Sequence, residues 1–139
     1  LTMDALVVTR HLPHLRAFAR RHPALPIVID HGAKPPIARG DLDVWCGEMR
    51  ALAVLPNIFC KLSGLVTEAA PTWTAGDLRP YVEHLLACFG AERLMWGSDW
   101  PVVNLAGGYA AWRAASLALL PAATHDAILG ATARRFYGI

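Results

Sequence analysis

The segment Arg93-Leu94-Met95-Trp96-Gly97-Ser98-Asp99-Trp100-Pro101-Val102 decides how the rest of the sequence is interpreted. Its apolar start, Leu94 to Trp96, stops at a polar turn that carries the carboxylate of Asp99. An apolar run that ends in a glycine-containing polar turn is typical of a buried parallel strand that presents a functional group at its carboxyl end. The alternative interpretation is that Asp99 only caps the following helix, as aspartate often does.

Outward from this segment, apolar runs alternate with helical periods along the whole chain. The predicted strands are Met3–Val8, Ile27–Asp30, Ile58–Leu62 and Leu94–Gly97. The predicted helices are Arg10–His22, Asp41–Leu55, Gly76–Phe89 and Asn104–Leu120, with short closing helices at Thr124–Leu129 and Thr132–Tyr137. Strands begin about 25 to 35 residues apart, which suits right-handed βαβ units. Their continuous apolarity indicates a parallel sheet buried on both faces. We therefore expect a single α/β domain over residues 1–139, either an open doubly wound sheet or part of a (β/α)8 barrel.

Composition excludes several classes of function. The formal net charge is only +2 and no basic stripe is present, so a nucleic-acid partner is not expected. No run approaches the roughly 18 apolar residues of a membrane span, and no signal peptide is visible. The cysteines, Cys46, Cys60 and Cys88, lie in apolar contexts without CxxC spacing. They are typical of buried reduced thiols, so we expect a cytoplasmic protein. No glycine-rich phosphate loop follows a strand, which argues against a nucleotide fold.

Three of the predicted strands end in chemically useful side chains, namely His31, Lys61 with Ser63, and Asp99. The carboxyl ends of parallel strands share one rim, so these groups are expected to converge there. Asp30 is predicted to be structural, because the two-residue alternation of a strand turns it away from a pocket that His31 faces. Two alternatives stay open. His31 is also compatible with a bond to a backbone carbonyl, and Lys61 with a structural ion pair to Asp30 or Asp99, since a buried lysine is costly unless paired.

Other features of the sequence bear on the edges of such a pocket. Trp96 is expected in the core, and Trp100 is expected to form an aromatic wall for a ligand. The connection from Val66 to Thr74 is longer than a usual strand-to-helix loop, which suggests a lid or a substrate-contacting segment. The remaining histidines are expected on the surface; they are His11, His14, His22, His84 and His125.

Four segments of the chain resemble the amidohydrolase-related lactonase family, which acts on sugar lactones and related carboxylated lactones. They are Ile29–Pro35 (IDHGAKP), Asn57–Leu65 (NIFCKLSGL), Phe89–Val102 (FGAERLMWGSDWPV) and Ala133–Gly138 (ARRFYG). The resemblance runs through nearly the whole chain in order, although Thr132 stands where the family usually has asparagine. It implies that the chain is the C-terminal half of a TIM-like (β/α)8 barrel, with four parallel strands that correspond to the fifth to eighth. The first half, with the HxH pair of its first strand, is absent from these residues.

The resemblance also implies a mechanism. Asp99 would act as general base on the water that opens the lactone ring, and it is the candidate ligand of a divalent metal such as zinc. His31 would polarise the lactone carbonyl or bind the substrate. Substrate-binding roles are expected for four further residues: Lys61, Ser63, Trp100 and Lys34. One histidine and one aspartate are too few for a zinc site without the missing HxH pair.

A four-stranded half barrel would expose two strand edges and an apolar inner face. We therefore expect it to pair with the missing N-terminal half, with a second copy as a homo-oligomer, or with a longer partner. Two alternatives to a lactonase remain. The chain is also compatible with a catalytically incomplete half barrel that only self-associates, and with a decarboxylase or hydratase of the same superfamily.

Overall fold

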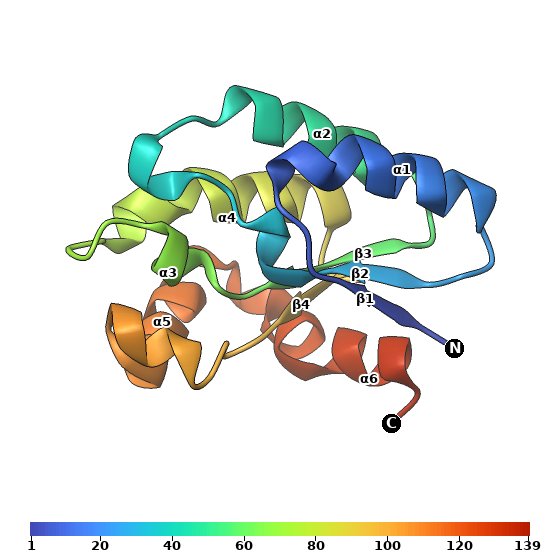
Figure 1. The fold of residues 1–139 in the computed structure, drawn as a ribbon. Coiled ribbons are helices and arrows are strands. Elements are labelled where there is room, and N and C mark those ends of the chain that lie inside the picture. The colour runs from blue at the N-terminus through green and yellow to red at the C-terminus, as the bar shows by residue number, and fades with distance from the viewer.

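The computed structural model describes residues 1–139 and contains one four-stranded parallel sheet in the order β1-β2-β3-β4 (Figure 1). The strands are β1 (Met3–Ala5), β2 (Ile27–Ile29), β3 (Ile58–Leu62) and β4 (Leu94–Trp96). Every neighbouring pair is parallel, and the register sets Ile29 beside Cys60 and Lys61 beside Met95. The predicted α/β fold, with four parallel strands alternating with helices, is confirmed.

The connecting helices lie on one side of the sheet. They are α1 (Leu12–Arg21), α2 (Asp43–Ala53) and α4 (Ala75–Phe89), and a short helix α3 (Leu65–Glu68) precedes α4. After β4 the chain forms α5 (Gly108–Leu119) and α6 (Thr132–Tyr137), which lie below the sheet in the view of Figure 1. Single turns occupy Thr9–His11, Asp30–Ala33, Ile37–Arg39, Val102–Ala106, Ala122–Thr124 and Ala127–Ala131. The chain therefore arranges its helices around a central sheet.

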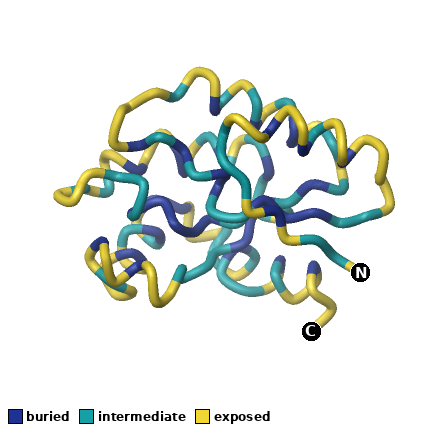
Figure 2. The backbone as a smooth tube through the Cα atoms, viewed as in Figure 1, coloured by how far each residue is buried: buried dark blue, intermediate teal, exposed yellow.

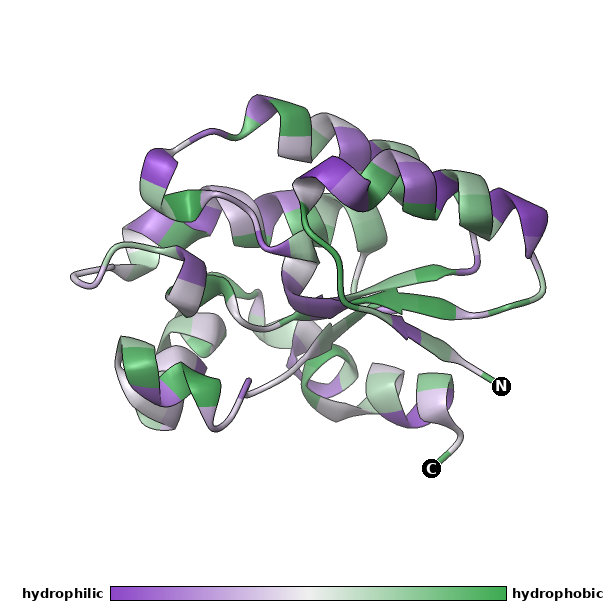
Figure 3. Cartoon of the chain, viewed as in Figure 1, coloured by the Kyte–Doolittle hydropathy of each residue, from purple (hydrophilic) through white to green (hydrophobic).

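The main core lies between the sheet and α1, α2 and α4. Figure 2 shows buried stretches along the central strands, whereas β1 is partly exposed, and Figure 3 shows the strands as mainly hydrophobic. Burial alternates along β3. Ile58, Cys60 and Leu62 are fully buried, whereas Phe59 and Lys61 are half-buried. Burying apolar surface in this layer supplies the main driving force for folding. At β3 the sheet therefore has an apolar face toward the helices and a second face that carries the charge of Lys61.

The helix α6 covers part of this second face of the sheet. Phe136 packs with Val28 and Met95, and its ring centroid lies 4.9 Å from that of Phe59. The expectation of a bare apolar inner face is therefore wrong in two respects, because α6 covers part of it and Lys61 places a charge on it.

The connections differ in detail from the predicted ones. The proposed lid from Val66 to Thr74 begins with α3, and the indole of Trp73 donates a hydrogen bond to the carbonyl of Ala106 at 3.0 Å. The predicted helix from Asn104 is interrupted because Gly107 adopts a φ of +92°, and α5 starts one residue later. No single helix has the length and apolarity of a membrane span, although α5 and the segment Ala122–Tyr137 meet that criterion together with a bend of 114°.

Half-buried histidines correct the surface prediction. His84 on α4 places Nε2 3.0 Å from the carbonyl of Cys46, and burial lowers the pKa of its ring. His125 places Nε2 3.1 Å from the carbonyl of Leu120, so it is also not a free surface group. The three cysteines are free thiols, but only Cys60 is fully buried.

Candidate active site

The structure brings His31 and Asp99 together at the carboxyl-terminal rim of the sheet. His31 lies two residues beyond β2 and Asp99 three residues beyond β4. Nε2 of His31 is 3.7 Å from Oδ1 of Asp99, and the two side chains are 23% and 14% exposed. A carboxylate beside an imidazole, both largely buried yet open to the rim, can accept a proton from water and donate a hydrogen bond to a bound ligand.

Both residues have left-handed backbone geometry, which non-glycine residues rarely adopt. The φ angle is +52° at His31 and +57° at Asp99. Such conformations persist where surrounding contacts hold them, and they gather at functional sites. Two buried indoles supply such contacts: Trp45 donates to the carbonyl of Gly32 at 2.7 Å, and Trp112 donates to that of Gly97 at 2.9 Å. The two strand ends are thus fixed by tryptophans from α2 and α5.

Ser63, at the end of β3, contacts His31 rather than an open pocket. Its Oγ lies 2.8 Å from Nδ1 of His31, and the residue is only 2% exposed. Gly64 comes next with a φ of +63° and packs against the same imidazole ring. No pattern in the sequence points to a role for Gly64, which is evident only from the close approach of the segment after β3 to His31.

Lys61 enters a different cluster. Its ammonium group lies 2.7 Å from Oδ1 of Asp30 and 2.5 Å from Oδ2 of Asp4, and the hydroxyl of Tyr137 donates to the same Asp4 oxygen at 2.7 Å. Burial alone would lower the pKa of Lys61, but its contacts with Asp30 and Asp4 outweigh that effect and raise it. The structure therefore shows the structural ion pair of Lys61 with Asp30, and not with Asp99. Asp4 was not foreseen as a partner.

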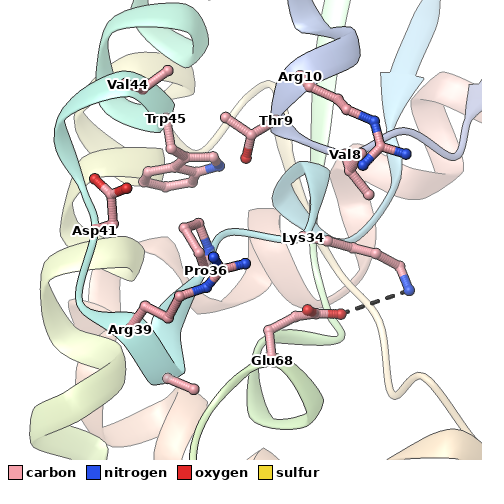
Figure 4. Close-up of a pocket in the computed structure, with 11 residues that line it drawn as sticks. Val8, Thr9, Arg10, Lys34, Pro36, Arg39, Asp41, Val44, Trp45 and Glu68 are labelled. Atoms are coloured by element: carbon pink, nitrogen blue, oxygen red, sulfur yellow. Dashed lines mark ion pairs between the residues drawn. The ribbon is translucent and has the colours of Figure 1, made fainter.

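The two other predicted substrate-binding residues lie at the rim without contacting His31 or Asp99. Lys34 Nζ is 3.6 Å from Oε1 of Glu68, and both line a cleft of about 700 Å³ together with Arg39 and Trp45 (Figure 4). Trp100 is 70% exposed, so its indole is free to contact a ligand. In contrast, the half-buried Trp96 packs against the core, as predicted, and its indole donates a hydrogen bond to the hydroxyl of Ser116 at 2.9 Å.

The side chains at the rim include one suitable ligand for a divalent metal, the carboxylate of Asp99. Carboxylate oxygens are ordinary zinc ligands, and the side chain of Asp99 is 14% exposed at the rim. No group of three histidine, cysteine, aspartate or glutamate side chains is arranged to hold a metal in this chain. A catalytic zinc site uses three protein ligands. Asp99 therefore fits as one ligand, and the rest of the set would come from outside these residues.

Known proteins of similar sequence and structure place this chain in a family. A family model described as Amidohydrolase matches residues 1–139. An L-fucono-1,5-lactonase from Burkholderia ambifaria is 57% identical over 117 residues, which span 82% of this chain and 40% of that protein. An L-fucono-1,5-lactonase from Burkholderia multivorans is 42% identical over 154 residues, spanning 98% of this chain and 51% of that protein.

A crystal structure of an amidohydrolase from Burkholderia multivorans with bound zinc superimposes with a TM-score of 0.90 and 42% identity. The superposition covers 99% of this chain and 52% of that one. The chain thus spans about half the length of its relatives and has the fold of half an amidohydrolase barrel. Because the family match extends over every residue, the chain belongs to the amidohydrolase family.

Proposed function

We propose that this chain supplies half of the active site of a lactonase that hydrolyses a sugar lactone, with L-fucono-1,5-lactone as the first substrate to test. The observation that carries the proposal is the pair of His31 and Asp99, 3.7 Å apart at the rim where barrel enzymes bind their substrates. The names of the two lactonase relatives supply the substrate class.

In this mechanism Asp99 takes a proton from water as the water oxygen attacks the lactone carbonyl. The Nε2–H group of His31 donates a hydrogen bond to the carbonyl oxygen as negative charge develops on it. The bond from the carbonyl carbon to the ring oxygen then breaks, and the proton held by Asp99 passes to that oxygen, which gives the open hydroxy acid. A positioned general base contributes about 10²- to 10⁴-fold to such a rate. A donor aimed at the developing oxyanion adds a comparable factor.

A divalent metal bound at the rim would polarise the lactone carbonyl and lower the pKa of a bound water. Asp99 is the residue of this chain that we propose as its ligand. The zinc in the Burkholderia multivorans amidohydrolase structure supports this proposal. Asp99 still orients the attacking water, and His31 still contacts the carbonyl oxygen.

Substrate contacts are proposed for the exposed indole of Trp100 and for Lys34 in the neighbouring cleft. Ser63 and Lys61 are left out of the proposed substrate contacts, because each is already engaged with another side chain of this chain. A cytoplasmic location is also proposed, since the three cysteines are free thiols.

The other half of the site is proposed to come from the remaining barrel strands or from a second copy of the chain. Two observations support this: the chain spans about half of its relatives, and it has no group of three side chains that could hold a metal. The same observations keep a second candidate function in view, a half barrel that folds and associates without turnover.

The test is hydrolysis of L-fucono-1,5-lactone, followed by acid release with spontaneous opening subtracted. Asp99→Asn should lower turnover by about 10²- to 10⁴-fold. Asparagine tolerates the left-handed backbone at this position, so the fold should persist. Asp126→Asn, an exposed carboxylate outside the site, is the control and should leave the rate unchanged. Equal turnover by the Asp99 variant would refute the base role. Activity of the chain alone would show that a second copy completes the site, and activity only after the remaining barrel half is added would show that those strands complete it. No activity in either case would favour the half barrel that associates without turnover.

A further inference from the structure

The imidazole of His31 is enclosed by the end of β3 on the side opposite Asp99. Ser63 contacts Nδ1 at 2.8 Å, whereas Nε2 faces Asp99 at 3.7 Å. The two ring nitrogens thus have different partners, one a buried hydroxyl and the other a carboxylate at the rim. In a neutral imidazole one nitrogen carries the proton and the other accepts, and the partner of one nitrogen sets the state of the other.

The hydrogen bond between the Ser63 hydroxyl and the ring of His31 indicates which ring nitrogen carries the proton. The hydroxyl of Ser63 is buried and has no side-chain or backbone partner except Nδ1 of His31. If Nδ1 carried the proton, the Ser63 hydroxyl would receive that bond and its own proton would be buried without an acceptor, which is costly. If Ser63 donates to Nδ1, both groups are satisfied and the ring proton lies on Nε2. That Nε2–H group then points toward the acceptor oxygen of Asp99.

Gly64 fixes the plane of the same ring. A Cβ atom at this position would lie 2.8 to 2.9 Å from Cβ, Cγ and Nδ1 of His31, closer than real Cβ contacts allow. A Cβ on Gly97 would likewise approach Cβ of Ser63 at 3.2 Å, so the Ser63 side chain is itself closely packed against the end of β4. The ring therefore has a hydroxyl at one edge and a side-chain-free backbone beside it, and little room to rotate.

We propose that Ser63 and Gly64 are positioning residues that hold His31 in the Nε2–H tautomer, with that N–H directed to the rim beside Asp99. The tautomer rests on the geometry alone; its consequence for turnover rests on the proposed lactonase function. Ser63 acts through His31 and does not touch the substrate. Loss of the Ser63 hydroxyl should therefore lower kcat, because only the molecules with the proton on Nε2 can donate to the lactone carbonyl.

Nitrogen NMR of protein labelled at histidine tests the tautomer without reference to activity. The unaltered protein should show His31 protonated at Nε2, and Ser63→Ala should give a mixture of both tautomers. Thr132→Val is the matched control, because Thr132 is also a buried hydroxyl donor, bonded to the carbonyl of Ala91 at 2.8 Å at the other end of β4. It should leave the His31 signals unchanged. A proton on Nδ1 in the unaltered protein, with or without added Zn²⁺, or an unchanged tautomer in Ser63→Ala, would overturn the proposal.

A pair of glycine variants tests the packing. Gly64 and Gly40 have similar φ angles of +63° and +68°, but a Cβ at Gly40 would meet nothing within 4 Å. Alanine therefore introduces comparable backbone strain at both positions and a clash with His31 only at Gly64. Gly64→Ala should shift the His31 resonances and lower kcat with little change in KM. Gly40→Ala should do neither. Equal effects of the two variants on the His31 resonances would show that strain, rather than contact with the ring, is responsible.

Discussion

Two neighbouring polar clusters both use residues in or directly after β2 and β3, and they differ in the partners of their carboxylates. Asp30 and His31 are adjacent in the sequence, yet Asp30 pairs with Lys61 and His31 faces Asp99. In the Lys61 cluster one ammonium is held between two carboxylates, and Tyr137 of α6 closes it. In the His31 cluster the carboxylate faces only an imidazole. A carboxylate paired with a lysine thus serves the fold, whereas a carboxylate that faces only an imidazole remains available for chemistry.

The largest effect should come from breaking the rim cluster at His31. Asparagine is the substitution of choice, because it tolerates the left-handed φ of +52°. Loss of a donor to the developing oxyanion should lower kcat by about 10²- to 10³-fold. Thermal unfolding should show a small change, since the ring is half-buried and makes one side-chain hydrogen bond. Unaltered kcat would remove His31 from the mechanism.

The next effect concerns the ion network. Lys61→Met should leave the carboxylates of Asp4 and Asp30 facing each other without a cation, and should lower the free energy of unfolding by about 1 to 3 kcal/mol, less than for a fully buried pair. Lys34→Met is the matched control, because the other lysine of the chain makes a more exposed 3.6 Å pair worth about 0 to 1 kcal/mol. Urea unfolding of both variants measures the difference. Unchanged stability with a tenfold higher KM for Lys61→Met would instead make Lys61 a substrate-binding residue.

A smaller effect is expected at the proposed aromatic wall. Trp100→Ala should change stability by less than about 0.5 kcal/mol, because the side chain is 70% exposed. If the indole contacts the lactone, KM should rise several-fold while kcat changes little. Steady-state kinetics provides both values, and an unchanged KM would exclude the contact.

The smallest effect concerns pH and lies away from both clusters. Burial lowers the pKa of His84 in the folded protein below the value of about 6.5 expected when it is unfolded. The unfolded chain therefore binds more protons as pH falls through the window below 6.5, and stability should decrease there. His84→Gln should flatten this part of the stability profile in urea titrations at pH 5 to 7. A profile identical to that of the unaltered protein would assign the slope to other groups.

The sequence was sufficient to predict the four strands, their parallel order and the meeting of His31 with Asp99. These follow from apolar runs and from the shared rim of parallel strands. It was insufficient for Lys61, because its partner Asp4 lies 57 residues away and is brought close only by the register of three strands. The role of Gly64 required the left-handed geometry of His31, which no residue pattern indicates.

Local breaks account for the remaining differences. Beta1 ends at Ala5 rather than at Val8, and α5 begins after the left-handed Gly107 rather than at Asn104. Element boundaries depend on such turns more than on hydrophobic period, so they were predicted less well than the elements themselves.

A double-mutant cycle of His31→Asn and Asp99→Asn in lactone hydrolysis tests most directly whether the two residues act as one unit. If they do, the double variant should lose little more turnover than the more damaging single variant, because groups that act together are strongly non-additive. If the two losses simply multiply, the residues act independently, and the proposed reaction centre is contradicted.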